Sequence, residues 1–204
     1  MIHLHYADDA LLVAEKPAGL LSVPGRTPEN QDCVVTRLQA LYPDALTVHR
    51  LDQVTSGLLL HARGKVMQAA LSAQFEQRQV HKRYHAVLEG LLEEDAGEVD
   101  LPLIVDWPNR PKQQVDHERG KPALTRWRVL ARDAASGRTQ VELEPVTGRS
   151  HQLRLHMASL GHPIVGDVLY GAQPAERVYL HACTLRFTHP LSGEPMTVAS
   201  PQPW

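Results

Sequence analysis

Short apolar runs divide the first third of the chain into a few elements. The run Leu11–Glu15 predicts a strand that Pro17 and Gly19 end. A helix capped by Asp32 and ended by Pro43 follows, because its apolar positions lie three and four residues apart, at Val34, Val35, Leu38 and Leu41. A second helix is predicted over residues 65–79, with Arg78 near its end and one face formed by Met67, Ala70, Leu71, Gln74 and Phe75.

The rest of the chain has mostly strand patterns. Strands are predicted over residues 47–49, 57–61, 80–90, 178–187 and 196–199, and a hairpin over 123–131 and 138–146. The acidic segment 91–97 and the proline-rich segment 100–112 have few strand signals and are expected to be loops. A helix is expected to begin at Ser150. The pattern predicts an α+β fold of mainly antiparallel strands with a few helices.

Length and composition indicate a soluble protein of ordinary type. A chain of 204 residues can form a single domain, 1–204, that needs no metal or disulfide to fold. No apolar run is long enough to cross a membrane, and the amino terminus lacks the pattern of a secretion signal, so we expect a cytoplasmic protein. Cys33 and Cys183 have no paired spacing and are interpreted as buried apolar residues.

The charge balance limits nucleic-acid binding to a local surface. The formal net charge is -2, so the whole molecule is not a basic body. One basic cluster exists, formed by Arg110, Lys112, His117, Arg119, Lys121, Arg126 and Arg128. Such a cluster is typical either of a nucleic-acid contact or of a solvated polar face, and charge alone leaves both interpretations open.

The stretch from His49 to Gly57 is the first candidate for chemistry. It places the carboxylate of Asp52 on a loop between two predicted strands, with Arg50 two residues earlier. Catalytic groups are often held on loops that a rigid scaffold fixes. A turn residue is the alternative, because an Asp before Thr55, Ser56 and Gly57 can serve only to shape the chain.

A second candidate is the motif that contains Gly148 and Arg154. His151, Arg154 and Met157 recur every three residues along the predicted helix. Arg154 falls in the first turn, where the helix dipole disfavours a cation, so a compensating anion is expected and Asp52 is one candidate. Tyr84 shares a strand face with Ala86 and Leu88, which equally fits a residue of the core.

Three separated motifs together resemble the RluA family of pseudouridine synthases: residues 49–57, residues 82–84 and residues 148–156. The segments 16–19, 161–167, 180–182 and 188–190 also resemble this family, so the resemblance covers nearly the whole chain. The proline-rich segment 101–112 and the lack of an additional amino-terminal RNA-binding domain resemble the short member that modifies both 23S ribosomal RNA and the transfer-RNA anticodon stem-loop.

The resemblance implies roles for particular residues. Asp52 matches the essential aspartate, Tyr84 the active-site tyrosine and Arg154 the arginine that ion-pairs with the aspartate. Arg50 matches the arginine that helps to take the uridine out of the stack, a step that costs a few kcal/mol. Further residues expected to contact the RNA substrate are His49, Thr55, Leu153, Arg110, Lys112 and Arg149.

The implied reaction conserves all atoms, because the uracil only exchanges its N1 bond to C1′ for a C5 bond. No cofactor, metal or obligatory protein partner is therefore expected. Asp52 acts either as a nucleophile at C1′ or as a base at the 2′ carbon, and an adjacent arginine favours its ionised form under both routes. The family also implies a mixed sheet with the active cleft across its middle.

Two other classes compete with this interpretation. A metal-dependent hydrolase is suggested by twelve histidines and by His3 and His5 near Asp8 and Asp9, although the HExxH spacing is missing. An RNA-binding module without catalysis would equally explain the basic cluster. A carboxylate among phosphate-binding arginines would repel RNA, so the presence of Asp52 favours an enzyme.

Overall fold

The structure, a computed structural model, describes residues 2–204, which fall into two compact units. Unit 1 comprises the chain up to Lys82 together with His181–Trp204, and unit 2 comprises Arg83–Leu180. The second unit is thus an insertion in the sequence of the first. The expectation of a single domain over the chain stays a prediction.

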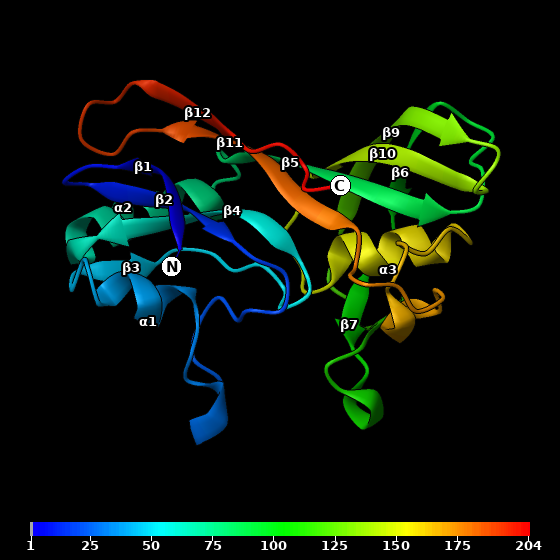
Figure 1. The fold of residues 1–204 in the computed structure, drawn as a ribbon, viewed down its shortest axis with the longest axis horizontal. Helices are drawn as coiled ribbons and strands as arrows, with labels where there is room; N and C mark the ends of the chain where they lie inside the picture. Colours follow the sequence, from blue (N-terminus) through cyan, green and yellow to red (C-terminus); the bar gives the residue numbers. More distant parts are fainter. Residues whose placement is uncertain (1) are drawn as a thin grey trace. The chain divides into compact units, whose positions relative to one another are not determined.

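Unit 1 contains a mixed sheet (Figure 1). Its strands follow the order β1 (His3–Ala7), β2 (Leu11–Lys16), β4 (Ser56–Arg63) and β11 (Leu180–Thr188), with β3 (Ala45–Thr47) also pairing β4 and β12 (Pro195–Ala199) pairing β11. The pair of β4 with β11 is parallel, whereas the other pairs of this unit are antiparallel. The expected α+β fold with a mainly antiparallel sheet is confirmed.

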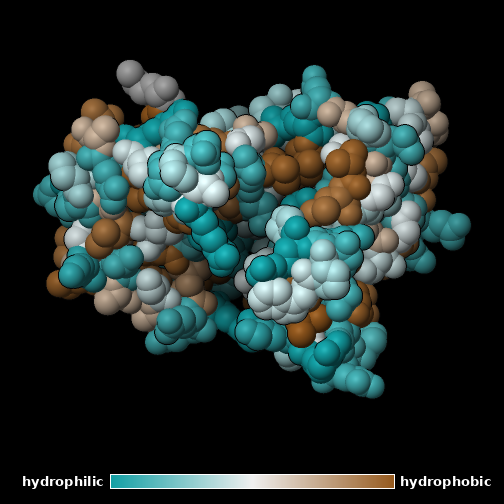
Figure 2. All heavy atoms as spheres, turned by 90° about the horizontal axis from the view of Figure 1, so that it is seen from below, coloured by the Kyte–Doolittle hydropathy of each residue, from teal (hydrophilic) through white to brown (hydrophobic). Residues whose placement is uncertain are grey.

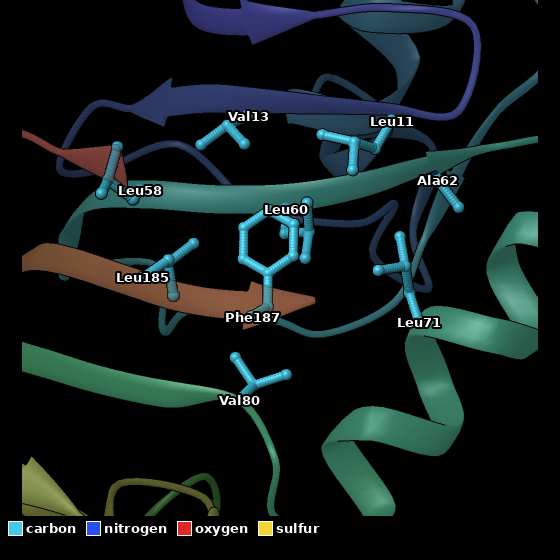
Figure 3. Close-up of a cluster of buried hydrophobic side chains, with 9 residues drawn as sticks. All are labelled: Leu11, Val13, Leu58, Leu60, Ala62, Leu71, Val80, Leu185 and Phe187. Atoms are coloured by element: carbon cyan, nitrogen blue, oxygen red, sulfur yellow. The ribbon is translucent and has the colours of Figure 1, made fainter. Parts of the chain in front are cut away.

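Two helices pack on the strands of unit 1. Helix α1 (Val34–Gln39) contacts β3, and α2 (Gly64–Glu76) contacts β3 and β4, while a short 3-10 turn, η1 (Pro28–Asn30), precedes them. The buried cluster that joins these layers, shown in Figure 3, consists of Leu11, Val13, Leu58, Leu60, Ala62, Leu71, Val80, Leu185 and Phe187. Residues from β2, β4, α2 and β11 therefore share one core, which fixes the strand after the Asp52 loop.

Unit 2 is built on antiparallel strands in the order β5 (His81–Glu89), β10 (Arg138–Pro145), β9 (Leu124–Asp133) and β6 (Ala96–Asp100). Helix α3 (Gln152–Ser159) packs on β9 and β10. A separate hairpin is formed by β7 (Leu103–Val105) and β8 (Gln113–Val115), with the 3-10 turn η2 (Trp107–Asn109) between them. The turn η3 (Val168–Tyr170) lies against α3.

Several sequence-based expectations about elements were wrong. Strand β7 and the ends of β6 lie in segments that were expected to be loops, and β8 lies where no element was predicted. Leu41 is exposed, because α1 ends at Gln39, and Arg78 lies beyond the end of α2. Cys33 occupies the N-cap position of α1 in place of Asp32, and His151, with a φ of 51°, occupies that of α3 in place of Ser150.

Hydrophilic and hydrophobic residues share the surface of the molecule where one face of it is drawn. On the face drawn in Figure 2, hydrophilic residues are intermixed with smaller groups of hydrophobic ones. Among residues 2–204, no helix is both long and apolar enough to span a membrane.

Candidate active site

The loop that carries Asp52 is anchored on its amino-terminal side. The Nε2 atom of His49 accepts a hydrogen bond from the backbone N–H of Leu60, at 2.9 Å, and the imidazole stacks on Phe75. Burial lowers the pKa of His49 to about 3, so its ring is neutral and can accept this bond. His49 thus joins the loop to β4 and α2, and its expected contact with RNA stays a prediction.

The residues on either side of Asp52 are also fixed. The buried Ser22 hydroxyl lies 2.8 Å from the carbonyl oxygen of Leu51 and 3.1 Å from its nitrogen, so one side chain satisfies both backbone groups. The N–H of Thr55 donates to the carbonyl oxygen of Asp52, at 3.1 Å, and closes a turn. Thr55 is buried, which favours the turn-shaping role considered for it, while Asp52 is half-buried and Arg50 exposed.

A buried lysine holds the next residue of the loop. Lys16 has no exposed surface, and its Nζ donates to the carbonyl oxygens of Pro17, Leu20 and Gln53, at 2.9, 2.7 and 2.9 Å. Two further hydrogen bonds join Gly19 and Gln53, one through the backbone N–H of Gly19 and one through the amide side chain of Gln53. The amino-terminal arm is therefore tied to the Asp52 turn. Sequence reasoning missed this role of Lys16, because these three acceptors are backbone groups.

Arg154 lies in unit 2, in the first turn of α3, and is 4% exposed. Its Nε lies 2.6 Å from Oδ2 of Asp167 and its Nη2 lies 2.8 Å from Oδ1. Asp167 is 1% exposed, so this is a buried bidentate ion pair. The expectation that this arginine needs an anion is confirmed, but the anion found here is Asp167, which sequence reasoning missed. The ion pair of Arg154 with Asp52 stays a prediction.

Tyr170 connects the surroundings of Arg154. The guanidinium carbon of Arg154 lies 5.2 Å from the centre of the Tyr170 ring. The Tyr170 hydroxyl lies 2.8 Å from Nδ1 of His151 and accepts a hydrogen bond from the backbone N–H of Gln113, at 2.9 Å. Tyr170 thus links α3 to the base of the β7–β8 hairpin. Nothing in the periodicity of the sequence pointed to it.

Buried polar groups hold the turn that precedes α3. The Gln152 side chain accepts from the Thr147 hydroxyl, at 2.6 Å, and from the backbone N–H of Arg149, at 3.0 Å. Its amide nitrogen donates to the carbonyl oxygen of Leu124, at 2.9 Å, and to Oγ1 of Thr125, at 3.0 Å. Gln152 therefore fixes the start of the helix that carries Arg154, a role that sequence reasoning also missed.

The remaining predicted residues of unit 2 differ in exposure. Tyr84 is buried on β5, opposite Leu143 of β10. Leu153 is buried in the first turn of α3, whereas Arg149 is exposed and donates through Nε to the carbonyl oxygen of Pro122. Burial of Tyr84 fits both interpretations of that residue, as a member of the core and as a ring that contacts substrate.

The basic cluster is divided by the fold. Arg119 pairs with Asp116, Arg126 with Glu98 of β6, and Arg128 with Glu142 of β10. Two of these three carboxylates come from neighbouring strands and are not visible as partners in the sequence. The cluster is therefore not one uninterrupted positive surface. Arg110 and Lys112 lie apart from these pairs, at the tip of the β7–β8 hairpin.

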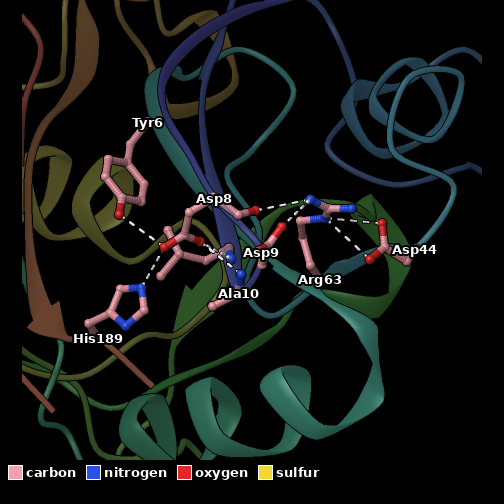
Figure 4. Close-up of polar contacts among 8 residues, drawn as sticks. Tyr6, Asp8, Asp9, Ala10, Asp44, Arg63 and His189 are labelled. Atoms are coloured by element: carbon pink, nitrogen blue, oxygen red, sulfur yellow. Dashed lines mark hydrogen bonds and ion pairs between the residues drawn. The ribbon is translucent and has the colours of Figure 1, made fainter. Parts of the chain in front are cut away.

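The acidic pair Asp8 and Asp9, which follows β1, makes structural links (Figure 4). Asp8 accepts hydrogen bonds from the backbone N–H groups of Ala10 and Leu11, and its other oxygen lies 2.7 Å from Nε2 of His189. Burial opposes ionisation of Asp8, but these bonds outweigh it and lower its pKa to about 2. Within residues 2–204, no group of three or more His, Cys, Asp or Glu side chains is arranged to hold a metal ion.

Comparison with known families defines the class of this protein. A family model described as RNA pseudouridylate synthase matches residues 10–159, a range that contains every site residue predicted from the sequence. The chain belongs to this family. It is therefore an isomerase whose substrate is RNA, in preference to the hydrolase and the non-catalytic binding module considered above.

Bacterial relatives share about half of their residues with the chain. The proteins named dual-specificity RNA pseudouridine synthase RluA from Vibrio cholerae and Yersinia pestis are each 52% identical to it, over 94% of this chain and 79% and 94% of their own lengths. The Escherichia coli K12 protein of the same name is 50% identical, over 96% of this chain and 91% of its own.

Solved structures agree with the family. Human RNA pseudouridylate synthase domain containing 1 aligns with a TM-score of 0.83 at 30% identity, covering 100% of this chain and 84% of that one. Human RNA pseudouridylate synthase domain containing 4 aligns with a TM-score of 0.80 at 26% identity, covering 98% and 88%.

Proposed function

We propose that Asp52, Tyr84 and Arg154 act together on one uridine of a structured RNA and convert it to pseudouridine. The observation that supports this proposal most directly is the clamped turn around Asp52. Ser22 holds the backbone of Leu51 and Lys16 holds that of Gln53, so the carboxylate between them is presented on fixed backbone. A group that is already held in place needs less ordering to reach the transition state, so the activation free energy is lower.

Asp52 is the group that reacts. As a nucleophile it attacks C1′ while the bond from C1′ to N1 breaks, and the carboxylate leaves again when C5 of the turned uracil joins C1′. As a base it instead removes the proton at the 2′ carbon and later returns it. In both routes C5 loses its proton and N1 gains one, so no group donor or redox cofactor is required. The proposed enzyme uses neither a cofactor nor a metal.

The other residues serve binding and orientation. Arg50 is exposed on the same loop as Asp52, where its planar guanidinium can replace the extruded base in the stack. The ring of Tyr84 contacts the uracil. Arg154, which Asp167 orients, stabilises the ionised form of Asp52. Arg110, Lys112 and Arg149 contact RNA phosphates, while His49, Thr55 and Leu153 shape the surfaces that hold the substrate.

The proposed targets are a uridine in 23S ribosomal RNA and one in the transfer-RNA anticodon stem-loop. Bacterial relatives named as dual-specificity enzymes support this choice, because they match over most of their length at about 50% identity. We place the enzyme in the cytoplasm, where both RNAs occur, and assign it no obligatory protein partner. One family model spans parts of both units, which supports their action as one catalytic domain.

The test is release of tritium from RNA labelled at C5 of uridine. Asp52→Asn should show no release, while its affinity for RNA stays within about tenfold of wild type, because the change removes a negative charge and no phosphate contact. Asp9→Asn is the matched control, since the Asp9 side chain is fully exposed, and it should retain wild-type release. Release by Asp52→Asn at the wild-type rate would overturn the assignment.

A further inference from the structure

The tip of the β7–β8 hairpin carries an exposed tryptophan stacked on an arginine. Trp107 is 64% exposed, and the guanidinium carbon of Arg110 lies 3.9 Å from the centre of a Trp107 ring. The guanidinium covers one face of the indole. Because most of the side chain is nevertheless exposed, the opposite face is open to solvent. An open aromatic face of this size is unusual for a residue type that normally loses much of its surface on folding.

The tip is ordered by its own backbone. The N–H of Asp106 donates to the carbonyl oxygen of Lys112, at 2.9 Å, and that of Lys112 donates to the carbonyl oxygen of Asn109, at 3.0 Å. The N–H of Asn109 donates to the carbonyl oxygen of Asp106, also at 3.0 Å. These bonds close the turn that carries Trp107, so the indole is held on a fixed backbone.

The base of the hairpin is anchored as well. The backbone N–H of Gln113, the first residue of β8, donates to the hydroxyl of Tyr170, which also packs beside Arg154. Figure 1 shows the hairpin extending from the vicinity of α3 to its short helical turn. A group bound at the tip is thus connected, within unit 2, to the surroundings of a predicted catalytic residue.

The charges at the tip suit a polyanion. Arg110 and Lys112 are both cationic, whereas the nearby carboxylate of Asp106 accepts a hydrogen bond from the side chain of Asn109, at 2.9 Å. An aromatic face beside cations is the combination that binds unpaired bases of a nucleic acid, because the ring stacks on the base and the cations attract the phosphates.

We propose that Trp107 and Arg110 form a stacking platform for one unpaired base of the RNA substrate, other than the uridine that is isomerised. The base lies on the open face of the indole, Arg110 remains on the opposite face, and Lys112 contacts the adjacent phosphate. The platform rests on the proposed function, since it assumes an RNA with unpaired loop bases. The enzyme would thus bind the RNA loop at two bases: the uridine that is isomerised and the base stacked on Trp107.

Steady-state kinetics on a synthetic RNA stem-loop with the anticodon-arm sequence test the platform. Trp107→Ala and Trp107→Leu should each raise KM and the Kd for RNA about tenfold, with kcat within twofold of wild type, because a stacked base contributes affinity and no chemistry. Trp107→Phe keeps an aromatic face, so its KM and its Kd for RNA should stay within about threefold of the wild-type values. Leu191→Ala removes another exposed apolar side chain and is the matched control, expected to behave as wild type.

Abasic substitutions in the loop of the RNA give a stricter test. At the position whose base stacks on Trp107, an abasic site should weaken binding to wild type about tenfold and leave binding to Trp107→Ala unchanged. A Kd for Trp107→Ala within twofold of wild type would contradict the platform. So would an abasic site that, at every loop position, weakens binding to wild type and to Trp107→Ala by the same factor. Absence of tritium release by wild-type protein would instead contradict the proposed function, while the binding comparison would still decide on the platform.

Discussion

The Nζ atom of Lys16 lies 2.9 Å from the carbonyl oxygen of Gln53, the residue that follows Asp52. This contact joins the end of β2 to the candidate catalytic turn, and the same ammonium group also holds Pro17 and Leu20. A fully buried charge retained with three carbonyl acceptors is costly to disrupt, because removing it leaves polar groups without a partner. Lys16 is therefore a positioning residue for Asp52.

Lys16→Met should lower both stability and activity. The methionine keeps the apolar stem but leaves the three carbonyl acceptors without the ammonium group, which should reduce the free energy of unfolding by about 3 kcal/mol. A displaced turn should reduce kcat at least about tenfold at a temperature where the variant is folded. Urea unfolding and tritium release measure the two effects. Lys65→Met, an exposed lysine on α2, is the control, and equal behaviour of both variants would refute the role of Lys16.

Asp167→Asn should be among the most damaging single substitutions in unit 2. The asparagine cannot neutralise Arg154, so a 4% exposed guanidinium would lose its buried carboxylate partner. Breaking one side of a buried pair costs about 3–5 kcal/mol of unfolding free energy. Asp116→Asn removes the partner of the exposed Arg119 and should reduce the free energy of unfolding far less, because solvent screens that pair. Comparable losses in the two variants, measured by urea unfolding, would contradict the importance assigned to Asp167.

Apolar runs and apolar periodicity predicted the elements that a core requires. Strands β2 and β4 are almost continuously buried, β10 alternates buried and less buried positions, and helix α2 contributes Leu71 to the core. Strand β6 could not be found in this way, since Val99 is its only buried residue. Its place depends on pairing with β9, where a side chain at Gly97 would collide with the Trp127 ring.

Only those features of the candidate site that depend on residues close together in the sequence could be predicted. The position of Arg154 in the first turn of a helix indicated that an anion was needed, because the helix dipole opposes a cation there. That Asp167 supplies one such carboxylate depends on the loop that brings it back to α3, thirteen residues later. Lys16 donates to three backbone carbonyl groups. Every residue has such a group, so no sequence motif could identify these acceptors.

Protonation of His61 should make stability depend on pH. His61 is 0% exposed, and neither ring nitrogen makes a hydrogen bond within the described part of the chain. Burial lowers its pKa to about 4 in the folded state, from 6.5 in the unfolded chain. Only the unfolded chain therefore takes up this proton as the pH falls from 6.5 towards 4. Stability due to this group is complete above pH 6.5 and is lost below it.

The expected loss for His61 between pH 8 and pH 5 is about 2 kcal/mol. His61→Leu should remove this part of the pH dependence. The free energy of unfolding of the variant, relative to that of wild type, should therefore be higher at pH 5 than at pH 8. His117→Leu, at an exposed histidine, should leave the dependence unchanged. Urea unfolding at several pH values measures both. The assignment would fail if wild type and His61→Leu had parallel curves.

Salt dependence should separate the cations that contact RNA from those held by carboxylates. Arg110 and Lys112 lie at the hairpin tip, so Arg110→Ala or Lys112→Ala should weaken binding and reduce the slope of log Kd against log salt by about 1. Arg126→Ala should leave that slope unchanged, because Glu98 already neutralises the guanidinium at 2.7 Å. Filter binding over a range of salt concentrations provides the slopes. Equal slopes for all three variants and wild type would make the whole basic cluster a solvated face, since release of counterions from RNA requires cations that replace them at the phosphates.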